Sequence, residues 1–219
     1  MRDLYIIAMG GFGRTVASLL EEVNQDRSTF NVVGFIDDHP SAENIDLAGR
    51  LGLEHVGDLA FLASRPSALI TTAHGSGRVR HRLAREALRH GHALADIVHP
   101  TATIGQNVDL GPGVIMAHHS VVTTNVRSGA LCLHNMFSIV GHDCRLADNV
   151  TLSPYASMLG GSRAEEGAWL ATKSTLDVNR VLGAGSILAA GAVAVRDVPA
   201  EVTAKGVPAW WDSPRKETA

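Results

Sequence analysis

The chain has 219 residues, 45% hydrophobic and 19% charged, an ordinary composition for a globular protein of one large or two small domains. Its 19 Lys and Arg residues against 22 Asp and Glu residues give a formal charge of −3 without a basic block, which argues against a nucleic-acid binder. The longest apolar stretch is too short for a membrane span, and no cleavage site of a secretory signal follows the N-terminus. We therefore expect a cytoplasmic protein without membrane insertion.

The first 98 residues alternate between strand and helix patterns. Apolar runs predict strands at 4–9, 31–36 and 68–72, and helical spacing predicts helices at 14–24 and 79–89. The glycine-rich turn Gly10-Gly11-Phe12-Gly13 joins the first strand to the first helix. This βαβαβ order predicts a Rossmann-like parallel sheet with helices on its faces.

The second half of the chain shows a period of six. Stepping by six from Ile104 to Ala194 gives sixteen positions in one phase, all aliphatic except Ser128 and His134. The residue four places after each of them is small, except Arg180. Three hexads form one coil of a triangular prism, so we expect a solenoid of about five coils over residues 101–198. The turn spacing of a β-sandwich, about 8–12 residues, is missing.

These hexads resemble those of the left-handed parallel β-helix acyltransferases, and the whole chain is similar to the NeuD/PglD-type family of sugar O- and N-acetyltransferases. Besides the glycine-rich turn, the segments that carry the resemblance are Gly34–Asp38, His99–Ala102, Asn135 with Val140–Cys144, and Gly206–Ala209. The resemblance implies a Rossmann-like nucleotide-sugar-binding domain at 1–98 and a left-handed β-helix acyltransferase domain with a C-terminal tail at 99–219. It also implies a homotrimer with its active sites between subunits.

The candidate catalytic pair is His142-Asp143. His142 is the third residue of its hexad, which puts it at a corner of the prism. Acyl transfer needs a base that titrates near neutral pH, and histidine has that property. The resemblance implies that His142 is the general base, that Asp143 supports it and that Asn135 contacts the acceptor. A solvated corner histidine without a catalytic role is the alternative interpretation.

The acyl donor implied by the resemblance is acetyl-CoA, lying in a groove beyond the base. The matching positions are Gly160, Thr172, Ala190 and Pro208. Thr151 stands where the family commonly has a second histidine, and its hydroxyl could contact the acceptor instead.

A metal site is not expected. Ligands on one face of the prism would be separated by multiples of about 18 residues. The histidines His118, His119, His134 and His142 lack that spacing.

The glycine-rich turn is a candidate phosphate site, because a helix start offers free N–H groups and the positive end of its dipole. An acid at the end of the second strand often contacts a ribose or a base. By resemblance we expect a nucleotide-linked sugar here, held by Gly11, Phe12, Gly13, Asp37, His74 and Arg78. The same loop would suit NAD, and its glycines could serve only close packing of helix and sheet.

The expected function is acetyl-CoA-dependent N-acetylation of the amino group of a nucleotide-linked amino sugar. One alternative is O-acetylation of a sialic acid or another hydroxyl acceptor. Another alternative is a β-helix without catalytic activity that binds a nucleotide sugar as a sensor or scaffold.

Overall fold

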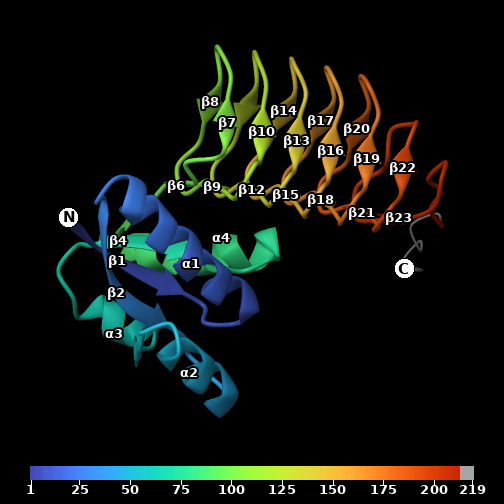
Figure 1. The fold of residues 1–219 in the computed structure, drawn as a ribbon. Helices are drawn as coiled ribbons and strands as arrows, with labels where there is room; N and C mark the ends of the chain where they lie inside the picture. Colours follow the sequence, from blue (N-terminus) through green and yellow to red (C-terminus); the bar gives the residue numbers. More distant parts are fainter. Residues whose placement is uncertain (213–219) are drawn as a thin grey trace.

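The computed structural model describes residues 1–212 and shows an α/β unit beside a long coiled prism (Figure 1). Residues 213–219 of the expected second domain lie outside the described residues. None of the helices in the described range is long and apolar enough to cross a membrane.

The N-terminal unit is a parallel five-stranded sheet in the order β3-β2-β1-β4-β5, as the Rossmann-like prediction requires. Its strands are β1 (Arg2–Ile7), β2 (Phe30–Ile36), β3 (His55–Gly57), β4 (Leu69–Thr72) and β5 (Ala93–Leu94). Its helices are α1 (Gly11–Asp26), α2 (Ala42–Gly49), α3 (Leu59–Ala63) and α4 (Gly77–Arg89). The sequence missed β3, β5, α2 and α3 because each is short. In α2 only Ala48 is buried, so no apolar period marks it.

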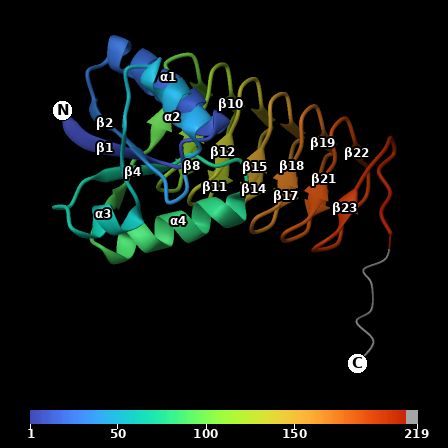
Figure 2. The same ribbon diagram turned by 90° about the horizontal axis from the view of Figure 1, so that it is seen from below.

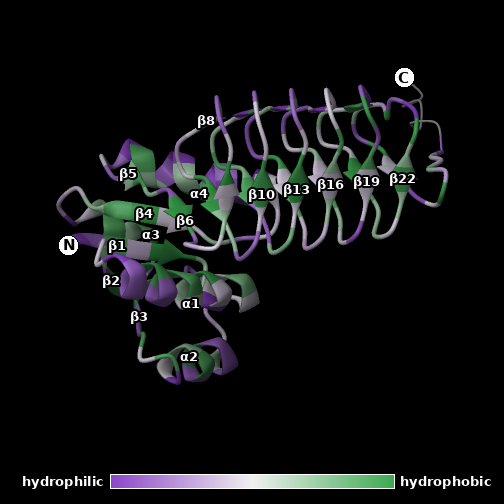
Figure 3. Ribbon diagram, turned by 45° about the horizontal axis from the view of Figure 1, so that its top comes forward, coloured by the Kyte–Doolittle hydropathy of each residue, from purple (hydrophilic) through white to green (hydrophobic). Residues whose placement is uncertain are grey.

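Both faces of this sheet are covered, which explains why β1 reads as a continuous apolar run. Leu4 and Ile6 pack with the buried side of α1, whereas Tyr5 and Ile7 pack with Leu83 of α4. Successive residues of a strand point to opposite faces, so one strand serves both layers. Figure 3 shows α1 in both hydrophilic and hydrophobic colours, as expected of a helix buried along one side.

The second unit is a left-handed parallel β-helix with three faces built from two-residue strands. The six-stranded face holds β7 (Thr103–Ile104), β10 (Val121–Val122), β13 (Ile139–Val140), β16 (Ser157–Met158), β19 (Thr175–Leu176) and β22 (Val193–Ala194). The five-stranded face holds β8 (Asp109–Leu110), β11 (Arg127–Ser128), β14 (Arg145–Leu146), β17 (Arg163–Ala164) and β20 (Val181–Leu182). The seven-stranded face holds β6 (Ile97–Val98), β9 (Ile115–Met116), β12 (Leu133–His134), β15 (Thr151–Leu152), β18 (Trp169–Leu170), β21 (Ile187–Leu188) and β23 (Thr203–Ala204).

The predicted period of six is confirmed. Strand pairs join residues 18 positions apart, as in Val122 with Ile104 and with Val140. The second residue of most strands is fully buried inside the prism, where stacked coils cover one another. The chain turns at each corner through a residue with left-handed φ, and along one corner these are Asn107, Asn125, Asp143, Gly161 and Asn179. Asn, Asp and Gly are the residue types that tolerate this conformation best.

The two ends of the prism depart from the prediction. β6 already pairs with β9, so the prism begins at Ile97, before the expected boundary at 98/99. Val198 bridges Leu182, 16 positions earlier, and thus stands in line with the aliphatic row instead of at the expected small position. The last coil is shorter by two residues than the regular 18, which shifts its phase.

The N-terminal unit packs against the start of the seven-stranded face. Outward-facing Ile115 and Leu133 are buried in the same cluster as α1 and β1. Figure 2 shows α4 running alongside the neighbouring coils. The α/β unit and the prism therefore share a core at their junction.

Candidate active site

His142 and Asp143 lie in the turn between β13 and β14, at the corner between the six- and five-stranded faces, which we name the His142 corner. Oδ2 of Asp143 lies 2.7 Å from Nδ1 of His142, so these sequence neighbours do face each other. The side-chain amide of Asn125 donates to Oδ1 of Asp143 over 3.2 Å. The hydrogen bonds from His142 and Asn125 lower the pKa of Asp143.

This geometry selects a tautomer. An ionised carboxylate only accepts hydrogen bonds, so it draws the proton of the neutral ring to Nδ1. Nε2 of His142 is then left with its lone pair, the form in which an imidazole accepts a proton. The pair has the arrangement of a general base and its supporting acid.

Gly160 lies one coil beyond His142, on the same corner. A Cβ at Gly160 would lie 2.5 Å from both Cε1 and Nε2 of the His142 ring. Glycine at this position leaves room for the imidazole. The expected contact between Gly160 and acetyl-CoA stays a prediction.

Three other expected residues lie on a different corner. Asn135, Thr172 and Ala190 occupy turns between the seven- and six-stranded faces. We name this edge the aromatic corner, because the rings of His119, Phe137 and Tyr155 stack along it with centroids 5.0 and 4.9 Å apart. The whole six-stranded face separates it from the His142 corner. One chain alone therefore does not bring these residues to His142.

The side-chain oxygen of Asn135 is used locally in this chain, since Oδ1 accepts the backbone N–H of Met136 at 2.8 Å. Pro208 lies in the segment after β23. Its expected role toward acetyl-CoA, like those of Thr172 and Ala190, stays a prediction.

The glycine-rich turn opens α1 as expected. A Cβ at Gly13 would clash with the carbonyl oxygen of Ala8, so Gly13 serves close packing of helix and strand. Gly11 is exposed and open to a ligand, and Phe12 beside it is partly buried. The two roles considered for the glycines therefore belong to different residues: Gly13 allows close packing, and Gly11 is available for phosphate binding.

Asp37 binds the turn itself. Its Oδ2 accepts the backbone N–H of Met9 at 2.9 Å, and its Oδ1 accepts that of His39 at 3.0 Å. The carboxylate shapes the loop in which the expected phosphate would lie. A contact between Asp37 and a nucleoside stays a prediction.

His74 follows β4 at the same edge of the sheet. Its Nδ1 accepts the backbone N–H of Ser76 at 3.1 Å. Burial first, and then the charge of Arg80, lower the pKa of His74, while Asp37 opposes them. His74 is therefore neutral at physiological pH, with Nε2–H available as a donor.

Arg78 contacts the β-helix. Its guanidinium lies 3.1 Å from a carboxylate oxygen of Glu201, in the last coil. Both side chains line a cavity of about 600 Å³ between the start of α4 and the prism. Other residues that line this cavity include Ser76, His81, Asn149 and Trp169.

Arg80 is a buried link between the two units, and no motif or repeat in the sequence singles it out. Its Nη1 donates to the carbonyl oxygens of His74 and Gly75 at 2.9 and 3.0 Å. Its other nitrogens donate to prism oxygens of Leu131, Asn149, Val150 and Thr151, over 2.9–3.2 Å. Burial lowers the pKa of Arg80 to about 10, so the guanidinium stays charged at neutral pH.

Thr151 belongs to this link. Its side chain is buried, and its Oγ1 accepts from Arg80 and donates to the carbonyl oxygen of Gly75 at 3.2 Å. The expected contact between Thr151 and an acceptor finds no support in the structure, because this hydroxyl is already used between the two units.

Comparisons with known proteins agree with this architecture. The PglD N-terminal domain matches residues 3–87. GDP-perosamine N-acetyltransferase of Escherichia coli O157:H7 is 28% identical, over 94% of this chain and 95% of its own. PerB of Caulobacter crescentus, whose structure contains CoA and GDP-perosamine, is 30% identical over 96% of this chain and 97% of its own, with a TM-score of 0.84.

The chain belongs to the NeuD/PglD-type family of sugar acetyltransferases. The acetyltransferase domain of PglB of Neisseria gonorrhoeae, in complex with acetyl coenzyme A, is also similar, at 28% identity, 96% coverage of this chain, 98% of its own and a TM-score of 0.74. The resemblance inferred from the hexads and the short motifs is confirmed.

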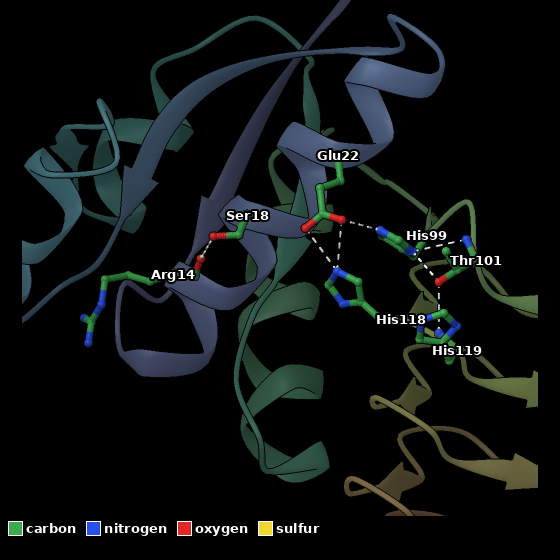
Figure 4. A network of polar contacts seen from close by, with 7 residues as sticks. All are labelled: Arg14, Ser18, Glu22, His99, Thr101, His118 and His119. Carbon is green, nitrogen blue, oxygen red and sulfur yellow. Dashed lines mark hydrogen bonds and ion pairs between the residues drawn. The ribbon is translucent and has the colours of Figure 1, made fainter.

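One titratable cluster of this family member was not foreseen (Figure 4). Glu22 of α1 reaches the prism, where Oε2 lies 2.9 Å from Nε2 of His99 and Oε1 lies 3.0 Å from Nε2 of His118. These hydrogen bonds, first with His118 and then with His99, lower the pKa of Glu22. The rings of His118 and His99 are in contact, with centroids 3.9 Å apart and a tilt of 36° between their planes.

The three residues each place one possible ligand atom within 4.8 Å of the others, which raises the question of a metal. The backbone N–H of Thr101 donates to Nδ1 of His99 at 3.2 Å, so the ring proton is on Nε2 and points at Glu22. A metal-bound imidazole needs the opposite tautomer, with the ligating nitrogen free and the other one donating. The cluster has the chemistry of a hydrogen-bonded bridge between the two units.

Proposed function

We propose that this protein transfers the acetyl group of acetyl-CoA to the amino group of a nucleotide-linked amino sugar. The observation that carries the proposal is the contact between His142 and Asp143, at an open corner where Gly160 leaves space for the ring. The relatives that share nearly the whole chain include a GDP-perosamine N-acetyltransferase and a protein bound to CoA and GDP-perosamine.

In the proposed reaction the neutral amine attacks the thioester carbonyl carbon, while Nε2 of His142 takes one amine proton. The tetrahedral intermediate then collapses, the C–S bond breaks and an amide forms. The sulfur leaves as CoA and receives the proton from the imidazolium. Asp143 keeps Nδ1 protonated throughout and stabilises the imidazolium.

The same proposal includes a trimer in which neighbouring copies complete each site. The side chain of His142 is 67% exposed in the single chain, whereas a proton transfer of this kind works best where water is excluded. Phe137, Ile139 and Tyr155 are 40–51% exposed on the aromatic corner and the adjacent six-stranded face. A second copy that covers these apolar side chains could present its aromatic corner, with Asn135, to His142.

Sedimentation analysis tests this assembly. Replacing Tyr155 with Asp should weaken the trimer and lower activity together, because a charge would be buried at the contact. Tyr5→Phe keeps an aromatic ring far from this corner and should leave both unchanged. An unaltered trimer with full activity in Tyr155→Asp would refute the proposed contact.

For the acceptor we propose two contact regions at the carboxyl edge of the parallel sheet. The exposed Gly11 at the start of α1 suits a phosphate, and Arg78, paired with Glu201, offers guanidinium N–H donors in the cavity beside α4. His74, which offers Nε2–H, lies between them in sequence. Both expected substrates are made inside the cell, so we also propose a cytoplasmic location.

The direct test is release of free CoA thiol from acetyl-CoA in the presence of GDP-, UDP- and TDP-linked amino sugars, with mass analysis of the product. His142→Ala should lower kcat by roughly 10²–10⁴-fold without unfolding the protein. His90→Ala, at the end of α4, is the matched control and should keep wild-type activity. Full activity in His142→Ala would eliminate the assignment of the base.

The two alternatives are weaker on structural grounds. Thr151, which was expected to contact the acceptor, is buried against Arg80 and so gives no support to a hydroxyl acceptor. His134, which interrupts the aliphatic row, is buried inside the prism in strand β12 and not at the His142 corner, so it gives no support to an inactive scaffold. Measured turnover with an amino sugar but not with its hydroxyl analogue would separate all three.

A further inference from the structure

Three residues spaced by 18 form a polar ladder along the His142 corner. Nδ2 of Asn107 donates to Oδ1 of Asn125 at 2.7 Å, and Nδ2 of Asn125 donates to Oδ1 of Asp143 at 3.2 Å. All three have left-handed φ between 56° and 62°, so successive coils present them in the same way. The last rung holds His142 through the other carboxylate oxygen.

The direction of this ladder is fixed by chemistry. The ionised carboxylate of Asp143 only accepts, so Asn125 must turn its NH₂ group toward it. The carbonyl oxygen of Asn125 then faces Asn107, which must present its own NH₂ group. Each amide therefore has one possible orientation, and the set ends on the Nδ1 proton of His142.

We propose that Asn125 is a positioning residue for the reaction, acting on His142 through Asp143, with Asn107 as its own support. This inference rests on the proposed function, in which His142 is the base. Asn125 holds Oδ1 of Asp143, so that Oδ2 stays directed at the ring.

The exposure of the carboxylate is the reason a second anchor matters. The side chain of Asp143 is 56% exposed, and its other rotamers would be solvated. A hydrogen bond from a neighbouring coil restricts that freedom and also favours the ionised form. Without this hydrogen bond, the carboxylate of Asp143 can rotate away from the imidazole of His142. The base is then less well aligned for proton transfer, whereas substrate affinity is unaffected.

The test is a double-mutant cycle between Asn125 and Asp143, followed by kcat and KM for both substrates. Asn125→Ala should lower kcat about tenfold with KM nearly unchanged, less than removal of the base itself. In an Asp143→Ala background the same change should have no further effect, because the residue through which Asn125 acts is gone. Asn107→Ala should give a smaller loss in the same direction.

Asn179→Ala is the matched control, because it removes the same side chain with the same left-handed φ two coils beyond Asp143. It should change kcat less than about twofold. Melting temperatures of all variants separate loss of fold from loss of alignment.

Each outcome has one meaning. Equal losses from Asn125→Ala in the wild-type and Asp143→Ala backgrounds would overturn the positioning role while leaving the base assignment intact. Wild-type kcat in Asn125→Ala would also overturn it. Full activity in His142→Ala would instead refute the underlying function.

Discussion

Oγ of Ser128 lies 3.0 Å from Nε2 of His134 inside the β-helix, and both side chains are buried. These are the two residues that interrupt the aliphatic row of hexads. They lie in consecutive strands of one coil, so each of these two polar residues provides a hydrogen-bond partner for the other. Nδ1 of His134 and Oγ of Ser138 are buried without a partner among residues 1–212. The coil that leads into the His142 corner therefore holds three buried polar side chains, Ser128, His134 and Ser138, among its apolar ones.

The first prediction concerns the stability of this coil in acid. Burial, with a smaller effect of Arg80, lowers the pKa of His134 from 6.5 to about 4. In the unfolded chain the imidazole of His134 becomes protonated below about pH 6.5, whereas in the folded chain it becomes protonated only below about pH 4. The free energy of unfolding should thus fall as the pH drops through this window, by about 2 kcal/mol between pH 7 and pH 5.

Urea unfolding of His134→Met, compared with the wild type at both pH values, isolates this effect. Ser128→Ala should be combined with it, so that no hydroxyl is left unpaired in the core. The double variant should be at least as stable as the wild type at neutral pH, since replacing both partners by apolar groups is nearly neutral. A pH dependence as steep as that of the wild type would show that His134 is not its source.

The second prediction concerns the space beside the base. Gly160→Ala places a methyl group where the imidazole of His142 lies, so the ring must move. We expect kcat to fall by roughly 10²-fold with the fold retained, because φ at Gly160 is not left-handed and alanine fits the backbone. Gly49→Ala, which meets no atom within 4 Å, is the control. Wild-type turnover in Gly160→Ala would show that the imidazole of His142 does not need the space beside Gly160 for the reaction.

The third prediction concerns the buried guanidinium of Arg80. Arg80→Met removes the donors of six oxygens at the junction and leaves several of them buried without a partner. We expect a loss of about 3 kcal/mol or more in the free energy of unfolding. Differential scanning calorimetry would detect it. Arg82→Met, on the same helix but exposed, should change stability by less than about 0.5 kcal/mol, and equal effects of the two would contradict the link.

The fourth prediction concerns the bridge made by Glu22. Its lowered pKa means that the bridge adds stability above about pH 4.5, the ordinary value, and loses it as the pH falls below. In Glu22→Gln an amide NH₂ would face one of the Nε2–H groups, so the melting temperature should drop at neutral pH and its decline in acid should become shallower. Chelation by EDTA should leave the melting temperature of the wild type unchanged. Purified protein with one equivalent of zinc that EDTA removes with destabilisation would show that the cluster is a metal site.

Much of the architecture could be predicted because the sequence pattern that produces it repeats at short, fixed separations along the chain. A solenoid buries each inward-facing residue against the equivalent position one coil away, so every coil needs aliphatic and small residues at the same places. The aliphatic residues at every sixth position from Ile104 to Ala194 show this requirement. The Asn, Asp and Gly residues at one corner follow from a left-handed φ that recurs every 18 residues. The short elements α2 and α3 lacked such a signal, because they bury too little for an apolar period.

The candidate site was only partly predictable. His142-Asp143 was found from a short motif, and the 2.7 Å contact agrees with the expected pairing. Thr151 was expected near the acceptor, but its partner Arg80 comes from the other unit, 71 positions away in sequence. No periodicity encodes such a contact.

By itself, then, the sequence determined the prism, its register and the corner on which His142 lies, because these depend on neighbours at fixed separations along the chain. Only the tertiary structure decided what the side chains at the junction do. Glu22, Arg80 and Thr151 are linked across the two units, where contacts depend on how two independently patterned surfaces meet. The same reason separates Asn135 from His142: the fold sets them on two corners of one prism.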